Sequence, residues 1–318
     1  MTLTWLWAGF VLVTGSMLAA DLGLLQKRAH PMRLREAGIM TSLWALLALS
    51  FCGVIAWAYG KDKAMQFLAG YILEQSLSVD NLFVFILIFH YFRVPPQDQP
   101  RILHWGILGA IVMRFVFLFA GVSLLQTFAF MFYVFGGVLV WTGGKMLFSS
   151  GEGAPQPGKN PALRLLHRFL PVTEGLHGQS FFTRAAGRLC ATPLFAALVV
   201  IEASDLVFAI DSIPAALGVT NDLFVVYTSN IFAVMGLRSM YFLLAGSMMK
   251  FRHLKTGVSM VLCFVGLKML AKDFLHISTE LSLAVIAGLL ALSVAASLVS
   301  DRERTVSTGP DGPSRPPA

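Results

Sequence analysis

Two segments of the chain carry pairs of carboxylic acids, six residues apart, inside otherwise apolar sequence. In each pair the second acid is followed by a small residue that can form hydrogen bonds, and the motifs are Glu74…Asp80-Asn81 and Asp205…Asp211-Ser212, with Glu202 just before the second. Carboxylate, amide and hydroxyl oxygens are hard donors that suit Mg, Mn or Ca. Neither motif contains His or Cys, which argues against copper(I) and zinc. The residue types therefore predict a site for a hard divalent cation, built from Glu74, Asp80, Asn81, Glu202, Asp205, Asp211 and Ser212.

Four basic side chains also lie inside apolar sequence, and they are Arg114, Lys145, Arg238 and Lys268. A charge at the centre of a bilayer costs about 2.5 to 3.5 kcal/mol on insertion scales, so acids and bases must meet one another. One interpretation is that the acids only form salt bridges between helices. The other, favoured because the acids outnumber the bases, is that the acids bind a cation and the bases act as counter-charges that hold the empty site together. Asp21, at the edge of the first apolar segment, either caps that segment or belongs to a proton path.

The elements that must position these side chains are apolar helices. The chain has 318 residues, of which 56% are hydrophobic and only 13% charged, whereas a soluble domain carries about 25% charged residues. Apolar stretches of this length cross a hydrocarbon core of about 30 Å as helices. We expect an all-α polytopic membrane protein with about nine transmembrane helices, at residues 3–20, 38–59, 66–92, 102–126, 128–148, 191–217, 223–249, 256–272 and 279–298.

The ionisable residues recur in the same order in two blocks of three segments. Residues 66–148 contain an acid pair, then Arg114, then the string Gly-x-Lys-Met-Leu. Residues 191–272 contain an acid pair, then Arg238, then the same string. Because three is odd, the second block enters the membrane from the opposite side. This order predicts an inverted three-plus-three helix repeat, with a substrate site near the bilayer midplane between the two blocks.

Helix geometry limits how the two acids of a pair can face one ion. At 100° per residue, acids six positions apart point about 120° away from each other. Pro214 leaves the carbonyl of Ile210 without its usual donor. We therefore expect a helix break beside Asp211, with a free carbonyl near the carboxylate. The first motif contains no proline, so a break there is expected from symmetry alone.

The distribution of Lys and Arg predicts the orientation of the chain. With the N-terminus outside and the C-terminus cytoplasmic, 17 of these residues fall in cytoplasmic loops and the tail, and 3 fall in outside loops, as the positive-inside rule requires. Topology thus accounts for the net charge of +7, and we expect lipid rather than nucleic acid as the partner. Outside the repeats we expect two helices and a basic loop in residues 1–65, a cytoplasmic connector at 149–190, a last helix in 273–300 and a disordered tail at 301–318.

Three strings of the sequence resemble the TerC family of integral membrane proteins, and most closely its Alx-like branch. They are FLAGYILEQSLSVDNLFVF, RILHWGILGAIVMR and IEASDLVFAIDSIPAALGVTNDLFVVYTSNIFAVMGLRSMYF, and the similarity runs from about Asp21 to Ser300. The resemblance implies an exporter of manganese(II) in a bacterial inner membrane, with a LysE-like transporter architecture. It also implies that the acidic motif residues of the family fall on the seven candidate ligands named above.

A secondary transporter is the function class that these features favour. The sequence has no nucleotide-binding loop of the G-x-x-x-x-G-K-[ST] kind. Export of a divalent ion against an inside-negative potential costs about 4.6 kcal/mol per 100 mV, and exchange for incoming protons would offset that cost. We expect Mn(II) as the transported ion, protons as the exchanged ion and no tightly bound cofactor.

Two other functions remain open from the sequence. One is a non-transporting membrane scaffold or assembly factor, and the other is an exporter of another hard divalent cation such as calcium. An enzyme is not expected, because the chain lacks Ser/His and H-E-x-x-H arrangements within a helix and the G-x-G-D pattern.

The predicted orientation can be tested with reporter fusions. We expect alkaline phosphatase fused after Arg304 to be inactive, because that enzyme must reach the outside to fold, and green fluorescent protein at the same position to be fluorescent. Phosphatase fused after Gly60, in a predicted outside loop, is the positive control. An active phosphatase after Arg304 would contradict the orientation.

Overall fold

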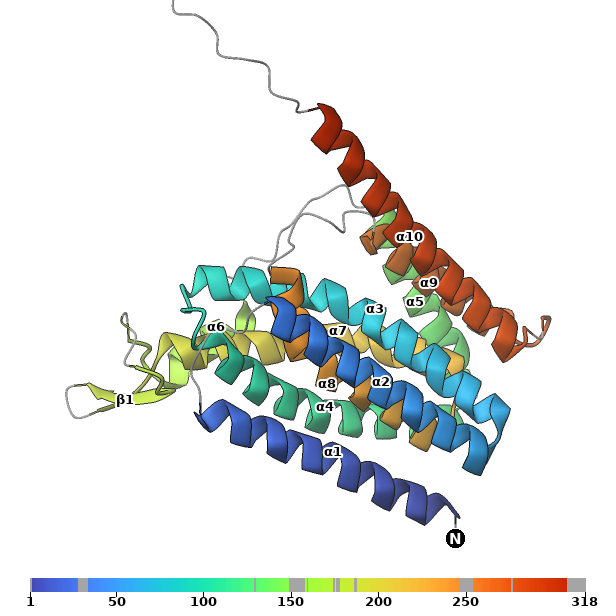
Figure 1. Cartoon of the computed structure of the whole chain (residues 1–318), viewed down its shortest axis with the longest axis horizontal. Helices are drawn as coiled ribbons and strands as arrows, with labels where there is room; N and C mark the ends of the chain where they lie inside the picture. Colours follow the sequence, from blue (N-terminus) through green and yellow to red (C-terminus); the bar gives the residue numbers. More distant parts are fainter. Residues whose placement is uncertain are drawn as a thin grey trace, which may run out of the picture.

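The computed structural model of the protein describes residues 2–27, 34–128, 130–148, 158, 160–173, 175, 178–185, 188–245, 254–275 and 277–307. Within these residues the chain is almost entirely helical (Figure 1). The long helices are α1 (Thr2–Lys27), α2 (Leu34–Tyr59), α3 (Lys61–Tyr91), α4 (Gln99–Thr127), α5 (Met131–Phe148), α7 (Pro193–Val219), α8 (Leu223–Ala245), α9 (Leu254–Leu270) and α10 (Thr279–Ser307).

Each predicted apolar segment corresponds to one of these helices. Six described helices, namely α2, α3, α4, α5, α8 and α10, are long and apolar enough to cross a membrane, and α7 makes a seventh if its two halves form one span. The helices α1 and α9 contain shorter apolar stretches, Thr4–Met17 and Thr256–Leu270. A polytopic helical membrane protein is therefore confirmed, whereas six or seven described helices, rather than nine, qualify as spans by length and composition.

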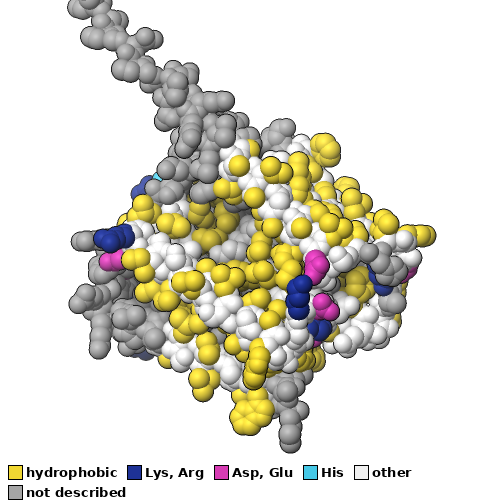
Figure 2. Space-filling model, turned by 45° about the vertical axis from the view of Figure 1, so that its right-hand side comes forward, with side chains coloured by type: hydrophobic (Ala, Val, Ile, Leu, Met, Phe, Trp, Pro, Cys, Tyr) yellow, Lys and Arg dark blue, Asp and Glu magenta, His cyan; other side chains and the backbone are white. Residues whose placement is uncertain are grey.

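The outer surface of the helix bundle is apolar. Figure 2 shows hydrophobic side chains over most of the face in view, with charged side chains in a few small groups. Trp57 of α2 and Phe148 of α5, for example, are 90% and 87% exposed. An apolar surface of this extent would drive aggregation in water, but it suits contact with lipid acyl chains.

Helix α8 occupies the centre of the bundle. It packs against α2, α3 and α4, and α7 in turn packs against α3 and α4. Nearly every residue of α8 is buried, including polar ones such as Asn230 and Arg238. A helix enclosed on all sides belongs to a protein core, so the polar groups of α8 face other helices and not lipid.

Helix α7 is bent where the sequence predicts a break. Its axis turns by 41° between Ala209 and Ser212. Ile210, in this break, lies four residues before Pro214, and its carbonyl receives no hydrogen bond because proline has no N–H group. The helix is nonetheless continuous from Pro193 to Val219, so the break is a bend and not an unwound turn. Among the described candidate spans no other break with a bend of more than 40° occurs, and the break expected in α3 by symmetry is not found there.

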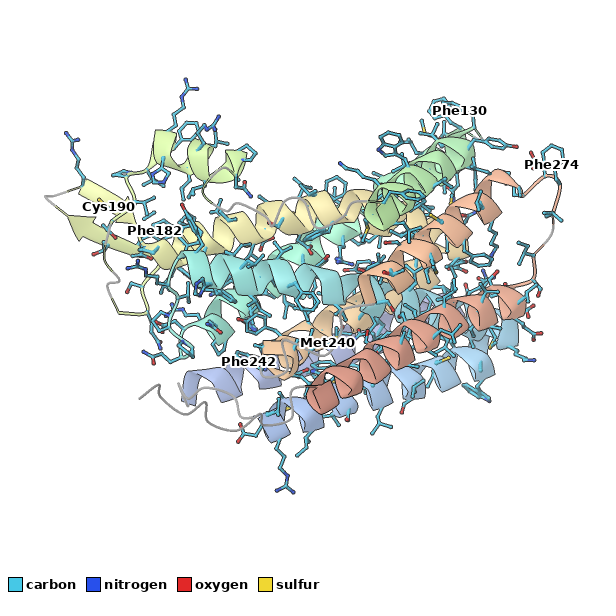
Figure 3. The ribbon with its side chains drawn as sticks, turned by 90° about the horizontal axis from the view of Figure 1, so that it is seen from above. Phe130, Phe182, Cys190, Met240, Phe242 and Phe274 are labelled. Carbon is cyan, nitrogen blue, oxygen red and sulfur yellow. The ribbon has the colours of Figure 1, made fainter. Side chains whose placement is uncertain are left out.

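The connector contains a β-hairpin, which corrects the all-α expectation. After the short helix α6 (Pro161–Phe169), the strands β1 (Phe182–Ala185) and β2 (Arg188–Ala191) pair antiparallel, with Phe182 opposite Ala191. The aromatic and β-branched residues of β1 suit a strand, and the Phe182 ring lies 4.5 Å from the ring of Phe195 on α7. The hairpin is thereby fixed to one end of the bundle, here called the connector end. Figure 3 shows Phe182 and Cys190 at this end and Phe130 and Phe274 at the opposite end.

Glycines bring α5 and α9 into backbone contact. A Cβ atom at Gly136 would lie 2.9 Å from the carbonyl oxygen of Gly266, and a Cβ atom at Gly266 would lie 2.8 Å from the carbonyl oxygen of Gly136. A Cβ atom at Gly143 would likewise lie 2.8 Å from the carbonyl oxygen of Ser259. Small residues allow membrane helices to approach closely enough for van der Waals packing to hold them together.

Neighbouring glycines of α5 provide a matched test of this contact. We expect Gly136→Ala to lower the free energy of unfolding by about 1 to 3 kcal/mol, because the added methyl group must push α9 away. In Gly137→Ala the methyl group meets no atom within 4 Å, and the better helix propensity of Ala should leave stability unchanged or slightly higher. Denaturant unfolding in detergent micelles measures both variants, and equal stability of the two would contradict the proposed packing.

Candidate functional site

Four polar side chains from four helices meet inside the bundle and form what we call the central cluster. They are Glu74 of α3, Arg114 of α4, Asp205 of α7 and Asn230 of α8, and their exposed fractions are 1%, 0%, 3% and 1%. Glu74, Arg114 and Asp205 lie near the middle of their helices, so in a membrane they would lie near the midplane. The first acid of each sequence motif thus reaches the same place.

The guanidinium group of Arg114 is the centre of this cluster. Its Nη1 donates hydrogen bonds to Glu74 Oε1 and to Asn230 Oδ1, the latter at 2.7 Å. Its Nη2 lies 3.6 Å from Asp205 Oδ1. A buried guanidinium is stabilised when its charge is paired, and here the carboxylates pair it although Nε and Nη2 form no hydrogen bond with another described residue. One base therefore holds together the two acids that the sequence motifs supply.

Several buried oxygens in and near the cluster have no hydrogen-bond partner among the described residues. They include Glu74 Oε2 and both carboxylate oxygens of Asp205, together with the hydroxyls of Ser78 and Ser212. A buried acceptor left without a partner costs about 1 to 3 kcal/mol. These oxygens leave capacity for a ligand that accepts electron pairs, and a hard cation is such a ligand.

Glu202 lies close to the cluster, but its carboxylate contacts α4 at another position. It precedes Asp205 by one helical turn and is half-buried, and its carboxylate rests directly on Gly109 of α4, where any Cβ atom would overlap it. Glycine at position 109 is therefore what leaves room for this carboxylate. The sequence analysis did not single out Gly109, since a glycine in an apolar helix carries no signal of its partner.

The other candidate ligands divide into two groups. Asn81 of α3 and Ser212 of α7 are buried, with 4% and 2% exposed. The side chains of the candidate ligands Asp80 and Asp211 lie outside the described residues, and so does that of Asp21, predicted as a helix cap or part of a proton path, so their predicted roles stay predictions. Among the described residues no group of three or more His, Cys, Asp or Glu could hold a metal ion; the site of seven ligands, which includes Asp80 and Asp211, stays a prediction.

The four predicted counter-charges lie in different parts of the structure. Arg114 lies between the acids Glu74 and Asp205. Arg238 is buried on α8, about two turns beyond Asn230 toward the connector end. Lys145 is exposed in the last turn of α5, and Lys268 is partly buried in the last turn of α9. Neither lysine forms an ion pair with another described residue, so the structure does not bring them to the central cluster.

Asn230 is the cluster residue that the sequence analysis missed. It follows Thr228 and Ser229 in an otherwise apolar helix, and this polar run is the signal that could have revealed it. The side-chain oxygen of Asn230 accepts a hydrogen bond from Arg114 without adding charge.

A small cavity joins the cluster on the side of the connector end. Asp205 borders it, and its other walls come from α3, α4, α7 and α8, including Phe85, Leu103 and Leu237. Leu103 lies about one turn from the start of α4, so the cavity extends from the carboxylate toward the connector end. Its walls are otherwise apolar.

Comparisons with known proteins agree with one another. The family model described as "Integral membrane protein TerC family" matches residues 59–305. An "Uncharacterized membrane protein" of Myxococcus xanthus is 48% identical over 302 residues, which cover 95% of this chain and 94% of that protein. The Salmonella typhi protein named "Putative membrane-bound redox modulator Alx" is 44% identical over 298 residues, 91% of this chain and 92% of its own. The Arabidopsis thaliana "Thylakoid membrane protein TERC, chloroplastic" is 46% identical over 254 residues, 80% of this chain and 66% of its own. No solved structure matches the chain.

A double-mutant cycle tests the ion pair at the centre of the cluster. We expect Glu74→Gln and Arg114→Gln, made singly and together, to give a coupling free energy of at least about 1.5 kcal/mol, because the pair is fully buried. The matched cycle uses Lys61→Gln and Glu280→Gln, which remove an exposed pair at 2.9 Å, and should show no measurable coupling. Unfolding in detergent measures both cycles, and equal couplings would contradict the buried pairing.

Proposed function

Because the chain belongs to the TerC family of integral membrane proteins, we propose that it is a secondary transporter that exports Mn(II) in exchange for protons. The observation that carries the proposal is the meeting of Glu74 and Asp205, the first acids of the two motifs, near the middle of the bundle. A protein that only needed stable helix packing could fill this space with apolar residues at less energetic cost. Charged residues retained at this depth mark ion pathways in membrane proteins.

The donor set favours a hard divalent cation. Glu74 and Asp205 supply carboxylate oxygens, and Asn81, Ser78 and Ser212 supply buried amide and hydroxyl oxygens on the same two helices. Mn(II), Mg(II) and Ca(II) prefer such oxygens, whereas copper(I) prefers thiolate and thioether ligands. Mn(II) is singled out by the family resemblance, and the side chains of Asp80 and Asp211 are proposed to complete its ligand set together with Glu202.

Helix packing supports the inverted repeat that such a transporter would use. Let α3, α4 and α5 form one unit and α7, α8 and α9 the other, so that α3 corresponds to α7 and α4 to α8. The repeat then predicts that the contact of α3 with α8 has a counterpart in the contact of α7 with α4. Both contacts are present, and the third helices of the units, α5 and α9, pack on each other. A rocking motion of one unit against the other would expose the central cluster to each side in turn.

Protons are proposed as the exchanged ion on energetic grounds. Moving two positive charges outward against an inside-negative potential costs about 4.6 kcal/mol per 100 mV. Two incoming protons would cancel that electrical cost, and carboxylates that lose a cation are able to take up protons. The proposed location is the inner membrane of a bacterium, with the N-terminus outside and the C-terminus in the cytoplasm.

The name of the Alx relatives points to a redox role for those proteins. In this chain the three cysteines are free and lie on separate elements, Cys52 on α2, Cys190 on β2 and Cys263 on α9. Their placement gives no thiol pair that could cycle between reduced and oxidised states. The central cluster therefore favours ion transport over thiol chemistry as the activity of this chain.

Transport by purified protein in proteoliposomes tests the proposal. We expect Mn(II) uptake into vesicles that hold a cation-sensitive dye, and at least a tenfold lower rate for Asp205→Asn, which keeps the shape of the side chain and removes its charge. Glu280→Gln, which removes an exposed acid at the start of α10, is the matched control and should transport normally.

The ion selectivity and the coupling are decided in the same vesicles. Equal Mn(II) uptake with and without a proton gradient would refute the exchange. Transport of Ca(II) but not Mn(II) would identify a calcium exporter. Transport of neither ion by well-folded protein would refute the transporter and leave the scaffold or assembly factor as the better function.

A further inference from the structure

The central cluster is already occupied by a positive charge that belongs to the protein. Arg114 contacts Glu74 from one motif, Asp205 from the other and Asn230 from α8. The guanidinium group keeps its proton at every pH at which a protein is folded. The carboxylates proposed to bind the transported cation are therefore the same ones that neutralise Arg114.

We propose that Arg114 is a tethered competitor of the transported cation, an internal ligand that fills the site when it is empty and must leave before a divalent ion can bind. This inference rests on the proposed function and concerns the regulation of the same site. The guanidinium group contacts the carboxylates of Glu74 and Asp205. A divalent cation bound by the same two carboxylates would lie next to the guanidinium group, and in a medium of low dielectric constant the repulsion between the two positive charges is large. The cation and the guanidinium group therefore compete for these two carboxylates.

Asn230 sets how firmly the competitor is held. Its side-chain oxygen accepts from Arg114 Nη1 at 2.7 Å, and its Nδ2 has no hydrogen-bond partner among the described residues. Because the amide is neutral, it aligns the guanidinium group without contributing to the binding of a cation by charge. Asn230 is therefore a positioning residue that acts on the site through Arg114.

A displaced guanidinium group would move toward the connector end. Side chains on a helix lean toward its N-terminus, so the side chain of Arg114 leans toward Ala110 and Gly106, which border the small cavity beside Asp205. Both residues are small, and the Glu202 carboxylate rests on the neighbouring Gly109. In this direction the guanidinium group would approach a third carboxylate, that of Glu202.

Competition of this kind has a measurable signature. The apparent affinity of a site falls by the fraction of time that the site is available, so a well-held Arg114 weakens cation binding and speeds cation release. Removal of the competitor should therefore tighten cation binding and slow turnover together. Removal of a residue that only stabilised the fold would instead lower both the cation affinity and the turnover rate.

Titration calorimetry of purified protein with Mn(II) tests the competition directly. We expect Arg114→Gln to bind Mn(II) at least tenfold more tightly than the wild type, and Arg114→Lys at least threefold more tightly, since a lysine cannot reach three partners with one ammonium group. In proteoliposomes the Arg114→Gln variant should show a lower KM and a lower maximal rate. Arg101→Gln, which removes an arginine near the start of the same helix, is the matched control and should leave affinity and KM unchanged.

Asn230→Leu keeps the test decisive if Arg114→Gln does not fold. This variant retains every charge of the cluster and loosens the guanidinium, so we expect Mn(II) to bind at least twofold more tightly. If Asn230 were instead a metal ligand, the affinity would fall. Binding of Mn(II) by the wild type with unchanged or weaker binding by Arg114→Lys and Asn230→Leu would overturn the competition and leave the transporter standing. Absence of Mn(II) binding and transport in the wild type would refute the proposed function itself.

Discussion

A guanidinium group is not stable inside a hydrocarbon layer unless carboxylates and other acceptors surround it, and this requirement fixes the centre of the molecule. Arg114 has no exposed surface, and its partners come from α3, α7 and α8. Four helices must therefore converge at one depth, because each charge would be costly without the others. The apolar clusters around them add packing, but packing alone does not specify which side chains face each other at the centre.

The periphery of the bundle is held by a different interaction. Between α5 and α9 the backbones touch at Gly136 and Gly266, and dispersion forces act over a short distance. The centre is thus specified by electrostatics and the glycine contact of α5 with α9 by shape.

The sequence located the helices well because the bilayer leaves a strong signal in hydropathy. The bend in α7 was also foreseen, since the effect of Pro214 on Ile210 is local. The cluster was foreseen only in part. Glu74 and Asp205 could be assigned to one site from the repeated order of acids, but the choice of Arg114 over Lys145 or Lys268 depends on which helices pack together. Lys145 follows an apolar run, which predicts a place inside the bilayer, but its side chain is exposed in the last turn of α5.

Asn230, Gly109 and the hairpin β1–β2 were missed for physical reasons that differ. A neutral amide costs much less than a charge in an apolar helix, so it draws no attention in a search for charges. The role of Gly109 exists only through the carboxylate that rests on it. The hairpin packs Phe182 against Phe195, which is a tertiary contact that the local sequence pattern does not indicate.

The enclosure of α8 has a consequence for biosynthesis. This helix carries Asn230 and Arg238, is less apolar than α4, and is surrounded on nearly all sides by protein. Alone in lipid it would be a less favourable membrane segment than α4, because the polar groups of Asn230 and Arg238 would face acyl chains. The helices that enclose it, α2, α3 and α4, precede it in the chain, and so does α7, which means that its partners have already left the ribosome when α8 emerges. The order of the helices along the chain thus lets α8 insert among helices that have already been synthesised, and a chain that presented α8 first would have to stabilise its buried polar groups by other means.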